Sequence, residues 1–184
     1  MPPQVIDSVN AHTKEVTCLA TNFGARNDVF TGSIDGRLVK TEEENGALHV
    51  HNTVDRAFGD GSGGAAIAIV SIKLGSAVGA VVVQGAGAMW GVWGIKTFKR
   101  ILVFLEPAPV MAFEVLGCSG DAEEAREEEA AAAGAGPKKS YMEIASLLTV
   151  AVAVAVGIRV YSLDINEAHG CCTHVLQVRP QPQP

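Results

Sequence analysis

The chain has 184 residues, a formal net charge of −6 and a hydrophobic fraction of 48%. This length accommodates one ordinary domain with a core, and the hydrophobic fraction excludes a wholly disordered chain. The acidic balance argues against a nucleic-acid-binding surface, because such surfaces need clustered Lys and Arg. Aromatic residues make up only 5%, so the core must be built mainly from Val, Ala, Leu and Ile.

The four cysteines indicate a reducing compartment. They are Cys18, Cys118, Cys171 and Cys172. No Cys-x-x-Cys pair is present and two of the cysteines are adjacent, which argues against a disulfide scaffold. Residues 1–10 form a mixed N-terminal tail that lacks the apolar stretch of a secretory signal. We therefore expect an intracellular protein, either cytoplasmic or nuclear.

Short strands separated by turns are predicted in the first third of the chain. Asp35-Gly36 is a strong tight-turn signal, and the acidic run from Glu42 is interpreted as a solvated polar turn. The strands predicted around these turns are Val16–Ala20, Asp28–Ser33, Arg37–Thr41 and Ala47–Val54. The glycine-rich segment Gly59–Gly64 follows. It lacks the Gly-Lys-Ser/Thr end of a phosphate-binding loop, so it is interpreted as a connector.

The middle of the chain is apolar. Ile67–Leu74 contains one lysine, and Leu74–Ile95 contains no charged residue. Ile101–Leu105 and Val110–Leu116 are strand candidates on either side of a proline-containing break. These stretches alternate with turn signals in the same way as the first third.

The last third begins with a change of composition at 118–140. Residues 121–129 hold six acidic residues and one arginine, and an alanine-glycine stretch follows them. This acidic, alanine-rich segment cannot bury much surface, so we expect a disordered insertion. Valine and alanine then alternate strictly from Val150 to Val156, which is the period-two signal of a strand. Residues 179–184 alternate proline and glutamine after Arg179 and predict a disordered tail.

Three stretches share one plan, an apolar strand, a tight turn of small residues and a second alternating strand. They are Val29–Gly46, Val81–Gly94 and Val150–Asp164. Together with Ala11-His12 and the Gly-Ser-Ile-Asp-Gly turn at 32–36, this repeat resembles the WD-repeat β-propeller family. The resemblance implies an all-β fold of about three propeller blades in an incomplete ring. The implied blades cover 11–58, 65–106 and 108–178, the last of them carrying the insertion 118–140.

The resemblance also implies a role for particular residues. His12, Ser33 and Asp35 would form most of a buried polar network, with Asp35 accepting from the imidazole and Ser33 bridging. The fourth member of this network is a tryptophan in the family, but this chain has Thr41 there. Trp93 in the second repeat and Tyr161 in the third occupy the same aromatic position. Such propellers need at least roughly four blades to close a ring, so protein partners are expected to supply the missing blades.

The alternative is a small integral membrane protein. Residues 74–95 are long enough for a span, which needs about 20 apolar residues, and Lys96, Lys99 and Arg100 follow as positive flanks. A second span at 144–158 is short for this purpose. Only under this alternative does the chain associate with a membrane.

No residue pattern predicts catalysis. Ser33, His12 and Asp35 together contain the residue types of a hydrolase triad, but triads are recognised by geometry and not by proximity in sequence. His169, Cys171, Cys172 and His174 are weak zinc-ligand candidates, because their spacing is not that of a known finger or ribbon. We expect no metal, no cofactor and no enzymatic activity. The predicted function is a non-catalytic protein–protein interaction scaffold, which is a subunit or a fragment of a larger assembly.

Overall fold

The computed structural model describes residues 8–23, 27–59, 65–119, 147–155, 157–166 and 171–178. In these residues the chain forms three four-stranded antiparallel sheets and a single turn of 3-10 helix, η1 (Ser76–Val78). Each sheet is built from four strands that are consecutive in the sequence. The expected all-β fold with three blades in an unclosed arrangement is therefore confirmed.

The first sheet has the order β1-β2-β3-β4. Its strands are β1 (Val16–Phe23), β2 (Asn27–Ser33), β3 (Leu38–Glu44) and β4 (Ala47–Val54). The hairpin between β3 and β4 turns at Asn45 and Gly46, both of which have positive φ angles of 55° and 81°. A two-residue turn of this kind matches the twist of the flanking strands. Strand β3 extends beyond its predicted end at Thr41, because Glu42, Glu43 and Glu44 also pair with β4.

The second sheet has the order β5-β6-β7-β8 and contains the residues of the first candidate span. Its strands are β5 (Ile69–Gly75), β6 (Ala80–Gly85), β7 (Met89–Gly94) and β8 (Arg100–Leu105). Residues 74–95 thus form the end of β5, η1, β6 and β7 instead of one helical span. Valine-rich alternation favours this outcome, because β-branched side chains disfavour helix and pack well on a pleated surface. In the described part of the chain, no helix has the length and apolar character needed to cross a membrane.

The third sheet has the order β12-β11-β10-β9. Its strands are β9 (Val110–Ser119), β10 (Leu147–Val154), β11 (Gly157–Asn166) and β12 (Cys171–Val178). The second candidate span, 144–158, contributes β10 and the start of β11. The predicted insertion at 118–140 lies outside the described residues from 120 onward, as does the predicted tail at 179–184.

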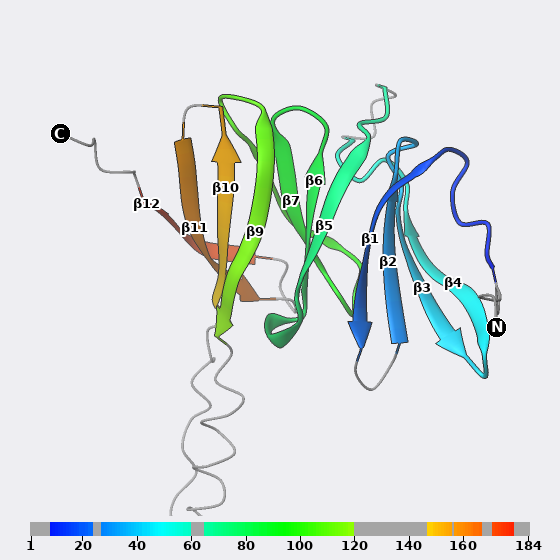
Figure 1. Ribbon diagram of the computed structural model, residues 1–184. Coiled ribbons are helices and arrows are strands. Elements are labelled where there is room, and N and C mark those ends of the chain that lie inside the picture. The colour runs from blue at the N-terminus through cyan, green and yellow to red at the C-terminus, as the bar shows by residue number, and fades with distance from the viewer. Residues whose placement is uncertain are drawn as a thin grey trace, which may run out of the picture.

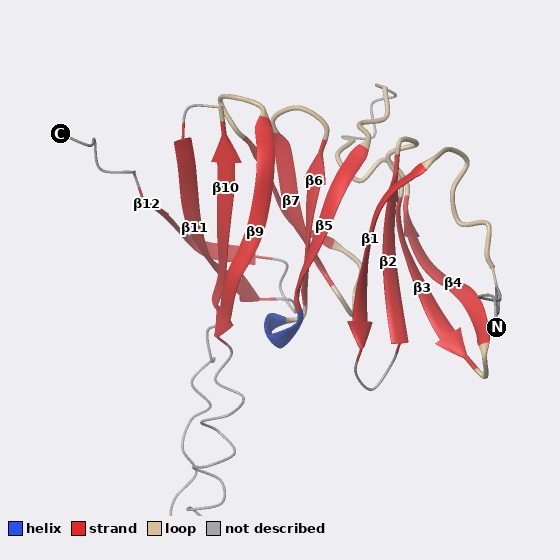
Figure 2. Cartoon of the chain, in the orientation of Figure 1, coloured by secondary structure: helices blue, strands red, loops and turns tan. Residues whose placement is uncertain are grey.

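The three sheets lie next to one another like successive blades of a propeller (Figure 1). In Figure 1 the first strand of each sheet lies toward the middle, and the last strands β4 and β12 lie at the outer ends. Figure 2 shows that strands make up nearly all of this arrangement. Lys73 on β5 and Glu114 on β9 join two neighbouring inner strands through an ion pair of 2.8 Å. Within the described residues, the first and third sheets each have a neighbouring sheet on one face.

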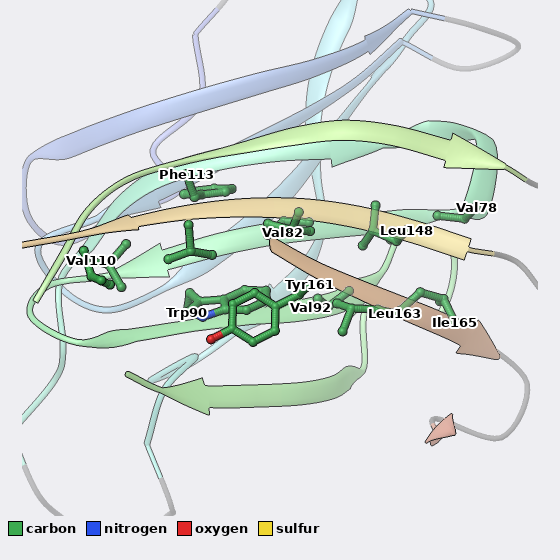
Figure 3. Close-up of a cluster of buried hydrophobic side chains, with 14 residues drawn as sticks. Val78, Val82, Trp90, Val92, Val110, Phe113, Leu148, Tyr161, Leu163 and Ile165 are labelled. Carbon is green, nitrogen blue, oxygen red and sulfur yellow. The ribbon is translucent and has the colours of Figure 1, made fainter. Parts of the chain in front are cut away.

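Two hydrophobic cores lie between the sheets. One fills the space between the first and second sheets and includes Phe30, Val83 and Trp93. The other lies between the second and third sheets and includes Trp90 and Tyr161, whose rings lie side by side in Figure 3. Both faces of the second sheet are therefore buried. This is why the strand β6 is buried at every position and shows no polar alternation.

Candidate functional site

The first sheet carries a polar network at the end of β2. His12 lies in the segment before β1, Thr31 lies on β2, and Asp35 lies in the turn between β2 and β3. His12 Nδ1 is 3.4 Å from Asp35 Oδ1, and His12 Nε2 is 2.8 Å from Thr31 Oγ1. The side chains of His12 and Asp35 are only 2% and 6% exposed. A buried imidazole is thereby supplied with a partner on each ring nitrogen, as its desolvation requires.

Asp35 organises the chain around it. Its Oδ2 accepts from the backbone N–H of Thr13 at 2.8 Å and from the Thr13 hydroxyl at 3.1 Å. Its Oδ1 accepts from the backbone N–H of Arg37 at 2.9 Å. Burial by itself raises the pKa of this carboxyl, but the hydrogen bonds from Arg37 and Thr13 hold the pKa well below its usual range. Asp35 is therefore a carboxylate that only accepts hydrogen bonds.

Thr31, and not the predicted Ser33, contacts the imidazole. The Ser33 hydroxyl instead accepts from the backbone N–H of Asp35 at 3.1 Å and donates to the carbonyl oxygen of Lys14 at 3.3 Å. Ser33 thus holds the turn, while Thr31 completes the network around His12. Both residues lie on the same face of β2 because strand side chains alternate with a period of two. The family resemblance implied Ser33, whereas the segment before β1 brings the His12 ring to Thr31.

A cavity of about 450 Å³ lies beside this network. Thr41 lines it from β3, at the position where the family resemblance implies a tryptophan. His12 and Thr31 supply polar wall atoms. The remaining lining residues are mostly small or apolar; they are Ser8, Val9, Asn10, Ala11, Lys14, Val16, Val29 and Leu48. The cavity thus has a mainly apolar surface, with polar groups contributed by His12 and Thr31 and also by Asn10 and Lys14.

In the second sheet an apolar cluster replaces the polar network. Trp93 is fully buried and packs edge-on against Phe58, with 5.4 Å between the ring centroids. Its indole N–H has no hydrogen-bond partner within the described structure. Val83 occupies the β6 position that corresponds to Thr31 on β2, so the acceptor that Thr31 could provide is replaced by a methyl group. Trp93 is therefore held by packing alone.

A buried carboxylate joins the second and third sheets. Glu106 Oε1 accepts from the indole N–H of Trp90 at 2.9 Å and from the Tyr161 hydroxyl at 2.5 Å. Its Oε2 accepts from Arg159 Nη1 at 2.8 Å. Trp90 lies on β7, whereas Arg159 and Tyr161 lie on β11. The Glu106 side chain therefore links the second and third sheets by hydrogen bonds. Phe104 stacks on Trp90 with 4.3 Å between ring centroids.

Sequence reasoning missed Glu106, although a positional signal existed. Glu106 precedes the first residue of β9 by four positions, and His12 precedes the first residue of β1 by the same number. The two side chains thus enter their blades from equivalent segments. Burial raises the pKa of the Tyr161 phenol, and the hydrogen bond to Glu106 raises it further. Tyr161 therefore stays protonated and donates to the carboxylate.

A second buried ion cluster was also missed. Lys40 Nζ lies 2.7 Å from Glu42 Oε1 and 3.4 Å from Asp28 Oδ2, and all three side chains are about 5% exposed. The interpretation of Glu42 as part of a solvated turn is therefore wrong. The register of β2 and β3 places Asp28 directly opposite Glu42, so the two carboxylates need the ammonium group between them.

The weak zinc candidates are not brought into a described site. Cys171, Cys172 and His174 belong to β12, and His169 lies outside the described residues. Among the residues that the structure describes, no group of three or more His, Cys, Asp or Glu side chains could hold a metal ion.

Comparison with known proteins supports the fold and not a particular family member. No protein-family model and no curated protein sequence matches the chain. Among solved structures, the computationally designed Ika4 protein has a TM-score of 0.55 at 15% identity, covering 98% of this chain and 80% of that protein. Sqt1 from Saccharomyces cerevisiae has a TM-score of 0.56 at 14% identity, covering 94% of this chain and 37% of Sqt1.

The WD40 repeats of RRP9 match with a TM-score of 0.50 at 12% identity, covering 91% of this chain and 40% of that chain. At these identities the likeness is one of fold alone. The chain thus has the fold of WD40-type propeller blades. It spans about two fifths of the length of the natural proteins it matches.

Proposed function

We propose that this chain is a non-catalytic protein-interaction scaffold, and that a protein partner supplies the blades that its three sheets lack. The observation that carries the proposal is the outer face of the third sheet. On β10 and β11 the residues facing the second sheet are buried, among them Leu148, Val150 and Leu163. The alternate residues face away from every other sheet in the described chain.

Around Ile158 this outer face is apolar and includes small residues. Ile158 is 58% exposed and lies opposite Ala153, and Val160 lies opposite Ala151. Alanine side chains allow another sheet to approach closely, and exposed apolar patches mark interaction sites more often than plain solvent-facing surface. A sheet of a partner protein packed against this face would bury it in the same way as the second sheet buries the other face.

The absence of catalysis is part of the proposal, even though the grouping of Thr31, His12 and Asp35 has the order of a hydrolase triad. An acyl-transfer site also needs hydrogen-bond donors for the developing oxyanion next to the nucleophile. Thr31 lies within β2, which pairs with β1 on one side and β3 on the other. The backbone N–H groups around Thr31 are hydrogen-bonded within the sheet and do not serve as oxyanion donors. This supports a structural role for Thr31, His12 and Asp35.

An intracellular location, cytoplasmic or nuclear, also belongs to the proposal. Cys18 is a free, half-buried thiol. Burial raises the pKa of this thiol, although the hydrogen bonds that its sulfur accepts from Thr17 and Gly32 act in the opposite direction. A protonated thiol in a reducing compartment resists oxidation, which agrees with this location. Imaging of the tagged full chain tests it.

The scaffold proposal is tested by site-specific photo-crosslinking of the full chain in cells. A photoreactive phenylalanine at position 158 should crosslink to a protein, and the same group at Glu44, an exposed residue at the far end of β3, should not. Ile158→Asp should abolish the association and leave the thermal unfolding midpoint unchanged, because the side chain is already exposed. An association that survives Ile158→Asp, or equal crosslinking from both positions, would contradict the proposal.

A further inference from the structure

The cavity on the first sheet corresponds to a position that large aromatic side chains fill in the other two sheets. Val29 pairs with Thr41 in the first sheet, Val81 pairs with Trp93 in the second, and Val150 pairs with Tyr161 in the third. Thr41, Trp93 and Tyr161 therefore share one position on the third strand of their sheets. Because threonine is much smaller than tryptophan or tyrosine, space remains at the first sheet, and this space is the cavity of about 450 Å³.

The cavity lies on the face of the first sheet that points away from the second. Trp93 and Tyr161 face the preceding sheet and belong to the two intersheet cores. Thr41 faces the same way, where the segment before β1 runs past the sheet and lines the cavity with Ala11 and His12 (Figure 1). The cavity is thus enclosed partly by a single chain segment and not by a packed sheet.

The polar wall of the cavity accepts a hydrogen bond. Asp35 is an ionised carboxylate, so the nearest ring nitrogen of His12, Nδ1, must carry the proton that faces it. With the Nδ1 proton facing Asp35, Nε2 is the acceptor, and the hydroxyl of Thr31 is assigned as its donor across 2.8 Å. The oxygen Oγ1 of Thr31 then keeps lone pairs that can accept a hydrogen bond from another group. A group in the cavity therefore complements this wall by bringing a donor.

The size and shape of the space select the ligand class. An apolar cavity of about 150 Å³ is enough to hold benzene, so 450 Å³ accommodates a bicyclic ring. We propose that this cavity binds an indole group, a flat aromatic ring with a single N–H donor, with the ring against Val29 and Leu48 and the N–H directed at Thr31 Oγ1. The group can come from a free small molecule or from a tryptophan side chain. This proposal does not depend on the scaffold proposal.

Binding of indole to the full chain, measured by isothermal titration calorimetry, tests the proposal. A ligand of nine non-hydrogen atoms should bind with a dissociation constant of roughly 0.1–1 mM. The analogue 1-methylindole keeps the ring and lacks the donor, so it should bind about 5- to 10-fold more weakly, the effect of one hydrogen bond. N-acetyltryptophanamide distinguishes the sources. Binding comparable to that of indole indicates a side chain, and binding of indole alone indicates a free small molecule.

Two variants and one matched control locate the binding. Thr41→Trp fills the space from within the chain and should weaken indole binding more than tenfold, whereas Glu44→Trp adds the same side chain at an exposed position of β3 and should not. Thr31→Val removes the acceptor and keeps the shape, so indole and 1-methylindole should then bind equally. The proposal is overturned if indole does not bind at millimolar concentration, if Thr41→Trp binds it as well as the wild type, or if 1-methylindole binds wild type as tightly as indole.

Discussion

Replacing Asp35 with alanine should destabilise the first sheet more than replacing an exposed acidic residue with alanine. The change leaves four donors without their acceptor: the N–H and hydroxyl of Thr13, the N–H of Arg37 and the imidazole of His12. Water can replace the carboxylate at Thr13, whose hydrogen bonds are exposed. The Arg37 and His12 donors are partly buried, so their loss dominates the cost. With about 1.5–3 kcal/mol for a hydrogen bond to a charged group and the long His12 contact counted at less, the free energy of unfolding should fall by about 2–3 kcal/mol.

Urea and thermal unfolding of the full chain measure this loss. For a chain of this size, about 2–3 kcal/mol corresponds to a decrease in the unfolding midpoint of roughly 5–10 °C. Asp55→Ala is the matched control, because Asp55 pairs with Arg37 at 2.8 Å but its side chain is 70% exposed. An exposed pair contributes about 0–1 kcal/mol. Equal effects of the two substitutions would refute the assignment of Asp35 as the centre of a buried network.

The pH dependence gives an independent check on Asp35. Its pKa is lower in the folded chain than the ordinary value of 3.8. A group of this kind contributes stability that is fully present above the unfolded pKa and is lost as the pH falls. The stability difference between wild type and Asp35→Asn should therefore be constant above about pH 5 and shrink below pH 3.8. A difference that does not change on acidification would contradict the reasoning.

Three further substitutions test other parts of the structure. Tyr161→Phe should lower the free energy of unfolding by about 1.5–3 kcal/mol in urea unfolding. Because the pKa of Tyr161 is raised in the folded chain, the wild type should lose this advantage as the pH rises above 10, the ordinary pKa of the phenol. Val83→Thr should be nearly neutral or stabilising in the same assay, since its hydroxyl can accept from the buried N–H of Trp93, whereas Val82→Thr on the opposite face should cost about 1–3 kcal/mol. Gly91→Ala should destabilise the second sheet, seen as a lower thermal midpoint, because its Cβ would lie 2.7 Å from a backbone carbonyl oxygen of β8.

The hairpins of the chain could be predicted because their signals are local. The alternation from Val150 corresponds to β10, and the Asp35-Gly36 turn connects β2 to β3 with Gly36 at a φ of 77°. Backbone conformation and strand periodicity depend on neighbouring residues only, so a single sequence records them. Residues 74–95 form strands and not the helical span of the alternative interpretation, because low charge alone does not distinguish a helix from a strand that is buried on both faces, as β6 is.

The partners of the buried polar groups could not be predicted in the same way. Thr31 and Ser33 are both hydroxyl residues on one face of β2, and only the path of the segment before β1 brings His12 to the first of them. Lys40 and Asp28 are twelve positions apart and meet because of the register between β2 and β3. Register depends on the whole hairpin, so a short motif does not reveal it.

The sequence by itself determined the strand content, the three repeated hairpins and the tight turns, since these follow from alternation of side chains and from glycine and asparagine at the turn positions. Only the tertiary structure decided how the sheets face one another. It placed Glu106 between Trp90, Arg159 and Tyr161, left Trp93 without an acceptor among the described residues, and opened a cavity at Thr41. The physical reason is that a buried polar group is satisfied by whatever donor packing brings within about 3 Å, and residues far apart in the sequence supply these donors only after the blades have packed.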